Sequence, residues 1–316
     1  MPLKRAKAWA LAVLIAALAG AGTAWFYHVS PEGYGDFDQI WLAARALRQG
    51  QEPYAEVAKL FPYPLYYPLP AVLCGLPFTL LPLGVARVAF AALGAGAFGA
   101  AILIKRPMAW PWLISFPFLY GVERAQWTPL LVAATLTPLS GIAACKPSIG
   151  LALFGYRPAR ATILGGAALL AVSFLVRPDW VEHWRAALVN APHLVPPARR
   201  PFGFLLLLAL LEWRSPEARL VGLLACVPQT LTLYELLPFA LVAPTWQVSA
   251  GLVLLTNVLY LGIVYVLQPS TQLQLADFTA SIWLPTLVMG YLPALVVVLW
   301  PRFRAWRKGE HLGAPA

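Results

Sequence analysis

The side chains that could do chemistry in this sequence are the few charged and polar residues that border long apolar runs. Charges are costly in or beside a lipid bilayer, so each of them is a candidate for binding or catalysis. Carboxylates there could serve as general bases, and cations could hold phosphate. The candidates are Asp36, Asp38, Arg124, Gln126, Lys146, His183, Arg199, Arg200 and Glu235.

Asp36 follows the Gly33-Tyr34-Gly35 stretch and precedes a helical pattern. One interpretation is an N-cap, because an Asp there would accept hydrogen bonds from free backbone N–H groups. The other is a general base at the mouth of a membrane cavity. Spacing alone leaves both open.

The basic candidates have a similar pair of interpretations. Arg124 and Lys146 lie between apolar runs, where they would either extend toward the interface or contact a phosphate, and the Arg199-Arg200 pair would bind a phosphate or a headgroup. His183 is either solvated or a participant in proton transfer. Glu235, inside an apolar stretch, must be paired, protonated or facing a water-filled cavity.

Several site types are missing from the sequence. It contains no Walker loop, no Gly-x-Gly-x-x-Gly, no His-Glu-x-x-His and no cysteine metal cluster. Cys74, Cys145 and Cys226 lie far apart in apolar segments and are interpreted as packing residues. A nucleotide-driven pump is therefore not expected, and no metal site or cofactor is predicted.

The elements that must position these residues belong to a membrane protein. Of the 316 residues, 60% are hydrophobic and only 11% charged, with a mean hydropathy of +0.70. The net charge of +10 suits anionic headgroups rather than nucleic acid. We predict one integral membrane domain over residues 1–316, an all-α polytopic helical bundle of about 9 to 12 spans.

The amino-terminal third should set the topology. Lys4, Arg5 and Lys7 precede an apolar run over 8–27, predicted to be a first spanning helix with a cytoplasmic basic end. Residues 28–67 then form an outer-face loop with short amphipathic helices along the membrane surface. Lys105-Arg106 would also fall outside if every segment crossed, so either an early segment does not cross or these bases serve an outer anionic lipid.

A family resemblance enters at this loop. Gly35-Asp36-Phe37, followed by Trp41, Gly50 and Pro53-Tyr54, resembles the first outer loop of glycosyltransferase family 87, membrane enzymes of the GT-C fold. Further similarities follow in order over roughly residues 1–245: Tyr66 to Pro70, Gln126 with Leu130-Leu131, and Ala143 to Pro147. The chain has Ala125 and Thr128 where the family has Gly and Asn.

The resemblance implies inverting transfer of a hexose, mannose in the related enzymes, from a polyprenyl phosphate to a lipid or glycan acceptor on the outer face of the membrane. The composition, rich in Ala, Gly, Pro and Trp, indicates a bacterium of high genomic G+C, so this membrane would be a bacterial plasma membrane. Asp36 would be the catalytic base. Donor or phosphate binding would fall to a wider set, with Asp38 the ligand of any divalent cation, which the reaction does not require. That set is Asp38, Tyr54, Arg124, Gln126, Lys146, His183, Arg199 and Arg200.

Two other function classes remain open from the sequence. A translocase for lipid-linked sugars would also need a polar membrane cavity with basic groups, but no aspartate in an outer loop. A non-catalytic membrane subunit would keep the fold to hold partners. Replacement of Asp36 separates them, because only an enzyme needs that carboxylate for chemistry.

Overall fold

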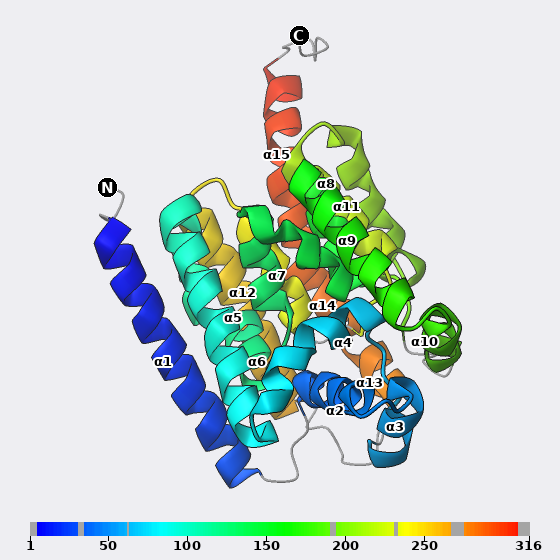
Figure 1. The fold of residues 1–316 in the computed structure, drawn as a ribbon. Helices are drawn as coiled ribbons and strands as arrows, with labels where there is room; N and C mark the ends of the chain where they lie inside the picture. Colours follow the sequence, from blue (N-terminus) through cyan, green and yellow to red (C-terminus); the bar gives the residue numbers. More distant parts are fainter. Residues whose placement is uncertain are drawn as a thin grey trace.

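The structure is a computed structural model that describes residues 5–30, 35–61, 63–189, 194–230, 233–266 and 275–308. In these ranges the chain is helical, and the isolated bridge between Val195 and Gln229 is its β-type pairing (Figure 1). The predicted all-α class is therefore confirmed for the described residues. The Gly33-Tyr34 part of the loop motif lies outside them.

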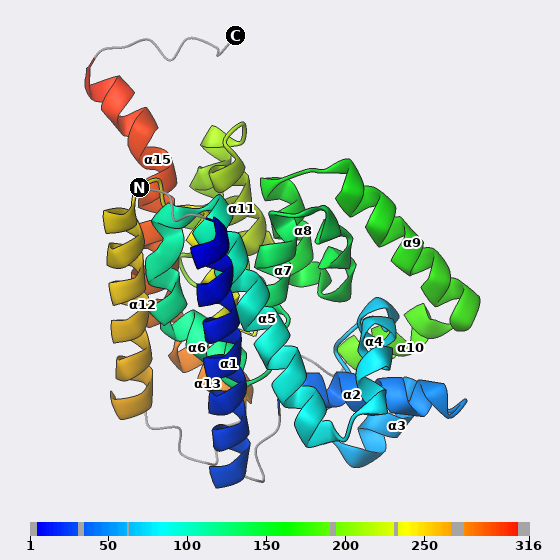
Figure 2. The same cartoon turned by 60° about the vertical axis from the view of Figure 1, so that its left-hand side comes forward.

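Four described helices are long and apolar enough to cross a membrane. They are α1 (Arg5–Val29), α5 (Leu83–Lys105), α12 (Trp246–Val266) and the continuous run Trp283–Arg307 formed by α14, η7 and α15. A fifth candidate joins α9 (Arg160–Val176) to α10 (Trp180–Val189) through a 100° bend, visible in Figure 2. The described residues thus contain four candidate spans, or five with the bent pair, which is fewer than the 9 to 12 predicted.

Prolines explain the difference, because they break the apolar stretches into short pieces. The stretch at 127–144 divides at Pro138, and the stretch at 109–122 divides at Pro117. The other elements, in chain order, are α2 (Asp36–Arg48), α3 (Pro53–Leu60), α4 (Leu69–Gly75), η1 (Leu76–Leu80), η2 (Pro107–Ile114), α6 (Phe116–Glu123), α7 (Thr128–Thr135), η3 (Pro138–Cys145), α8 (Pro147–Tyr156), η4 (Pro197–Arg199), η5 (Gly203–Glu212), α11 (Pro216–Cys226), η6 (Leu233–Leu241), α13 (Leu275–Ser281), α14 (Trp283–Thr286), η7 (Leu287–Tyr291) and α15 (Leu292–Arg307).

Helices α1 and α5 pack antiparallel through small residues, as membrane helices often do. A Cβ atom on Gly96 would lie 2.9 Å from that of Ala16, so the close approach needs glycine. The pairing returns Lys105 to the end of the molecule where Arg5 begins α1. The carboxyl-terminal end of α15 also lies at this end (Figure 1).

This arrangement bears on the two alternatives for Lys105-Arg106. The segment Leu69–Leu80 is helical but spans only about 18 Å, against the roughly 30 Å of a bilayer core. Both observations favour the alternative in which an early segment does not cross, because α5 ends at the same end of the molecule at which α1 begins.

Helix α2 lies at the opposite end of the molecule (Figure 1) and is embedded there. Phe37 stacks on Phe90 of α5 with ring centroids 4.3 Å apart, and Phe90 meets Trp127 edge-on. Phe37 and Ile40 are fully buried. This helix, which was predicted to lie along the membrane surface, is covered on most of its faces by α3, α4, α5 and η1.

Candidate functional site

A cavity of about 440 Å³ opens beside the first residue of α2, and we call it the Asp36 pocket. Its volume is in the range of small-molecule sites. Segments far apart in the sequence line it: Asp36, Tyr66, Tyr67, Pro68, Lys146, Pro147, Ser148, Leu151, Trp184, Leu188, Leu194, Val227, Pro228, Thr230, Tyr234 and Glu235. The lining includes the charged side chains of Asp36, Lys146 and Glu235, and leucine and valine side chains complete it.

The carboxylate of Asp36 is oriented by two phenols. Tyr67 donates its O–H to Oδ2 at 2.8 Å, and Tyr234 donates to the same oxygen at 3.4 Å. Among the described residues nothing donates to Oδ1, so that oxygen is available to a ligand in the pocket. Asp36 can therefore accept a proton or a hydrogen bond from a bound hydroxyl group.

Gly35 brings this carboxylate close to the rest of the bundle. A Cβ atom on Gly35 would lie 2.2 Å from the hydroxyl of Tyr27 and 3.0 Å from the carbonyl oxygen of Arg124. The same carbonyl accepts the backbone N–H of Asp36 at 3.1 Å. The glycine thus permits the contact that fixes the start of α2 against α1 and α6.

Lys146 supplies the positive charge of the pocket. Its ammonium donates to Oε1 of Gln126 at 3.2 Å and lies 4.4 Å from the ring centroid of Tyr234. Burial lowers the pKa of Lys146, whereas the charges of Asp36 and Glu235 raise it. Lys146 is also the N-cap residue of α8, whose helix dipole adds positive potential at its amino-terminal end.

A Schellman turn at the end of α6 positions Gln126. Its N–H bonds back to the Gly121 carbonyl at 2.7 Å, and the N–H of Ala125 bonds to Val122 at 3.0 Å. Ala125 therefore sits at the left-handed position of this motif, with φ of 49°, where glycine is usual.

Ala125→Val should lower the stability of the protein by about 2 kcal/mol or more, because a β-branched residue is strained at positive φ. Ala125→Gly should stay within about 1 kcal/mol of wild type, since relief of strain offsets the lost methyl group and the added freedom of the unfolded chain. Denaturant unfolding in detergent micelles measures both. Equal effects of the two variants would contradict the assigned turn.

Glu235 is the second carboxylate of the pocket and is 3% exposed. Its Oε1 accepts the backbone N–H of Thr230 at 3.2 Å, and it interacts electrostatically with Lys146 and Arg200. From the sequence, this carboxylate was required to be paired, protonated or facing a cavity. In the structure it is both paired with these groups and part of the pocket lining.

Comparison with known proteins adds nothing to this geometry. No family model, curated protein or solved structure matches the chain.

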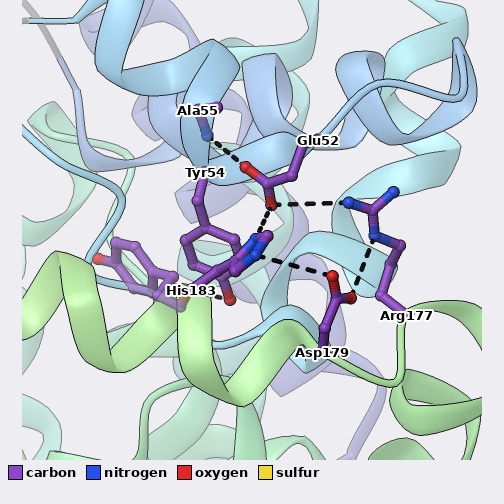
Figure 3. A network of polar contacts seen from close by, with 7 residues as sticks. Glu52, Tyr54, Ala55, Arg177, Asp179 and His183 are labelled. Atoms are coloured by element: carbon purple, nitrogen blue, oxygen red, sulfur yellow. Dashed lines mark hydrogen bonds and ion pairs between the residues drawn. The ribbon is translucent and has the colours of Figure 1, made fainter.

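A polar cluster joins the start of α10 to the start of α3 (Figure 3). Glu52, the N-cap residue of α3, accepts a hydrogen bond from Nδ1 of His183 at 2.9 Å, and Asp179 and Arg177 complete the group. His183 also meets Tyr54 edge-on. These side chains stand outside the pocket lining, but they hold Trp184, which does line it and donates to the Tyr66 carbonyl at 2.9 Å.

Tyr54 and His183, which were predicted to take part in donor binding, do not line the Asp36 pocket. Tyr54 is buried and donates to the Tyr67 carbonyl at 3.3 Å, behind the phenol that contacts Asp36. His183 anchors α10. Both were predicted from motif and type alone, which do not reveal the direction in which a side chain points.

Asp38, another residue predicted to take part in donor or cation binding, is held by Arg87 and Gly35. Arg87 holds it with two hydrogen bonds of 2.5 and 2.7 Å, and the N–H of Gly35 donates to it at 2.9 Å. The side chain is 1% exposed and does not line the pocket. Asp38 is therefore the residue that caps α2, and the cap alternative considered for Asp36 applies to Asp38 instead.

The three arginines predicted to bind phosphate do not line the pocket either. The guanidinium of Arg124 lies over Phe26 and Tyr120. Arg199 is exposed. Arg200 donates to the Thr279 carbonyl at 3.3 Å and interacts electrostatically with Glu235. Lys146 is the one predicted cation that reaches the lining within the described part of the chain.

Sequence reasoning did not single out Tyr67, Tyr234 and Trp184, which line the Asp36 pocket. Tyr67 belongs to the Tyr66 to Pro70 motif, for which no binding role was predicted. For Tyr234, the signal in the sequence was its position directly before the isolated Glu235. Among the described residues, no group of three or more His, Cys, Asp or Glu side chains is placed to hold a metal ion.

Proposed function

We propose that this protein is a membrane glycosyltransferase that moves a hexose from a polyprenyl-phosphate donor to a hydroxyl group of a lipid or glycan acceptor. The observation that carries the proposal is the Asp36 pocket, where an oriented carboxylate and a buried ammonium face one cavity with an apolar side. The GT-C fold and the choice of mannose rest on the sequence resemblance.

The proposed reaction is a single displacement. Asp36 accepts the proton of the acceptor hydroxyl through Oδ1, while the hydroxyl oxygen attacks the anomeric carbon. The bond from that carbon to the phosphate oxygen breaks, and polyprenyl phosphate leaves with the bonding electrons. Lys146 and the amino-terminal end of α8 stabilise the charge of the departing phosphate.

The apolar side of the pocket suits the donor's lipid chain. Leu151, Leu188, Leu194 and Val227 line it, and Leu151 is 52% exposed on the outer surface of the bundle. A prenyl chain could follow these residues from the pocket toward lipid, since burial of its methylene and methyl groups is favourable.

The charge distribution supports an outward-facing site. The start of α1 at Arg5, the end of α5 at Lys105 and the basic end of α15 lie at one end of the molecule (Figure 1). Cytoplasmic ends of membrane helices carry the excess of Lys and Arg. The Asp36 pocket, beside α2 at the other end, then faces the outside or periplasm of a bacterial plasma membrane.

Lys146→Met should weaken donor binding by about 100-fold, because it removes a charge-assisted contact of about 2 to 3 kcal/mol with phosphate. Titration of a fluorescent polyprenyl-phosphate donor into nanodiscs measures the dissociation constant. Lys59→Met, an exposed lysine of α3 that pairs with Glu56, is the matched control and should bind normally. Unchanged affinity of a folded Lys146→Met protein would contradict the assignment.

The function itself is tested with purified protein, labelled polyprenyl-phosphate-mannose and a membrane lipid extract as acceptor. The proposal predicts a new labelled product and release of polyprenyl phosphate. A translocase would instead move the intact donor across proteoliposomes and form no product, and a non-catalytic subunit would do neither.

A further inference from the structure

Two of the three cysteines meet in the folded protein, although the sequence places them in separate apolar segments. The thiol of Cys145 donates to Sγ of Cys74, and the sulfur atoms are 3.6 Å apart. The two cysteines are 71 positions apart in the sequence. Cys145 is buried and Cys74 is partly exposed. We propose that Cys74 and Cys145 are a disulfide-forming pair that ties two walls of the Asp36 pocket together.

The positions of the two residues favour closure. Cys74 lies in the last turn of α4, and Cys145 is the last residue of η3, so both are at the ends of short helices that pack against each other. A disulfide needs a sulfur separation of about 2.05 Å, so the pair must close by roughly 1.5 Å. Side-chain rotation and a small shift at the two helix ends can supply that movement.

The pair also has a defined order of reaction. Because Cys145 donates its S–H to Cys74, the pKa of Cys74 is lowered and the pKa of Cys145 is raised. Cys74 is also the more exposed of the two. It is therefore the thiol that ionises first and meets an external reagent, and thiolates are the reactive form.

The oxidant is a disulfide, either that of a dithiol–disulfide oxidoreductase or a small organic disulfide. The Cys74 thiolate attacks one of its sulfur atoms, forms a mixed disulfide and releases the other sulfur as a thiolate. Cys145, after losing its proton, attacks Cys74 Sγ and expels the second thiolate. Two protein thiols are oxidised, and one disulfide is reduced to two thiols.

The bond has a clear structural consequence. Helix α4, which carries Cys74, directly follows Tyr67 and Pro68, and Cys145 directly precedes Lys146. The disulfide would therefore join the segment whose tyrosine orients Asp36 to the segment that carries the Lys146 ammonium. Neither the contact nor the chemistry depends on the proposed glycosyl transfer. The inference stands or fails separately from that function.

The test is peptide mapping of protein purified from membranes after free thiols are trapped with N-ethylmaleimide. A second sample is reduced, oxidised with diamide and trapped in the same way. We expect a linked Cys74–Cys145 peptide in the oxidised sample, with Cys226 alkylated in both. Recovery of Cys74 and Cys145 as alkylated thiols after diamide, or a link from either to Cys226, would overturn the proposal.

Variants and unfolding give an independent readout. Cys226→Ser should retain the link, whereas Cys74→Ser and Cys145→Ser should abolish it and leave one alkylated partner each. The oxidised wild-type protein should unfold about 5 °C or more above the reduced protein, since the bond closes a long loop in the unfolded chain. Cys226→Ser should show the same shift, and neither single variant at the pair should show it.

Discussion

Asp36→Asn should slow sugar transfer by about 100- to 10,000-fold while leaving donor affinity within a factor of about 2 to 3. The amide keeps the size of the carboxylate but cannot accept the proton of an attacking hydroxyl, and general-base catalysis contributes about this much to a rate. Binding should survive because Lys146 and the apolar lining are unchanged. Transfer rates and donor titrations on the same nanodisc sample measure the two effects.

The matched control is Glu56→Gln, which removes a carboxylate of the neighbouring helix α3 that pairs with Lys59 outside the pocket. It should transfer at the wild-type rate. Full activity of Asp36→Asn would exclude Asp36 as the base. Loss of donor binding in that variant would show that the carboxylate acts in recognition, as a carrier would require.

Arg87→Met should cost about 3 to 5 kcal/mol of stability, which is the largest effect expected from a single substitution outside the pocket. It leaves the carboxylate of Asp38, 1% exposed, with the N–H of Gly35 as its remaining donor. An uncompensated buried charge is strongly destabilising. Unfolding in denaturant, followed in micelles, gives the difference in free energy.

A second substitution separates the charge effect from lost packing. Arg87→Met combined with Asp38→Asn should recover most of the loss, because a neutral amide can still accept from Gly35 and burial already raises the pKa of Asp38. The control is Arg45→Met, at an exposed arginine of α2, the helix that carries Asp38. It should change stability by less than about 0.5 kcal/mol. A single Arg87 variant as stable as wild type would contradict the role given to this pair.

The local features of the site could be predicted from the sequence. Composition indicated the all-helical membrane class, and the short motifs around Asp36, Gln126 and Lys146 identified three residues that the structure brings together. Each of these motifs is a turn followed by a helix, and neighbouring residues determine such structure.

The long-range partners could not be predicted in this way. Arg87 is 49 residues from Asp38, and Tyr234 is 198 residues from Asp36. Such pairings depend on how the helices pack, which hydrophobic periodicity does not encode when the buried and lipid-facing sides of a helix are both apolar. The number of spans failed for a related reason, since hydropathy alone does not register the breaks at Pro117 and Pro138.

The most direct test of the account is the anomeric configuration of the product that wild-type protein forms from labelled donor and membrane acceptors. A single displacement with Asp36 as base predicts a sugar linkage inverted relative to the donor, which proton-coupled carbon NMR of the product would show. A product with retained configuration would require a covalent intermediate and contradict the base role. Donor that is consumed no faster than in protein-free nanodiscs would contradict the glycosyltransferase itself.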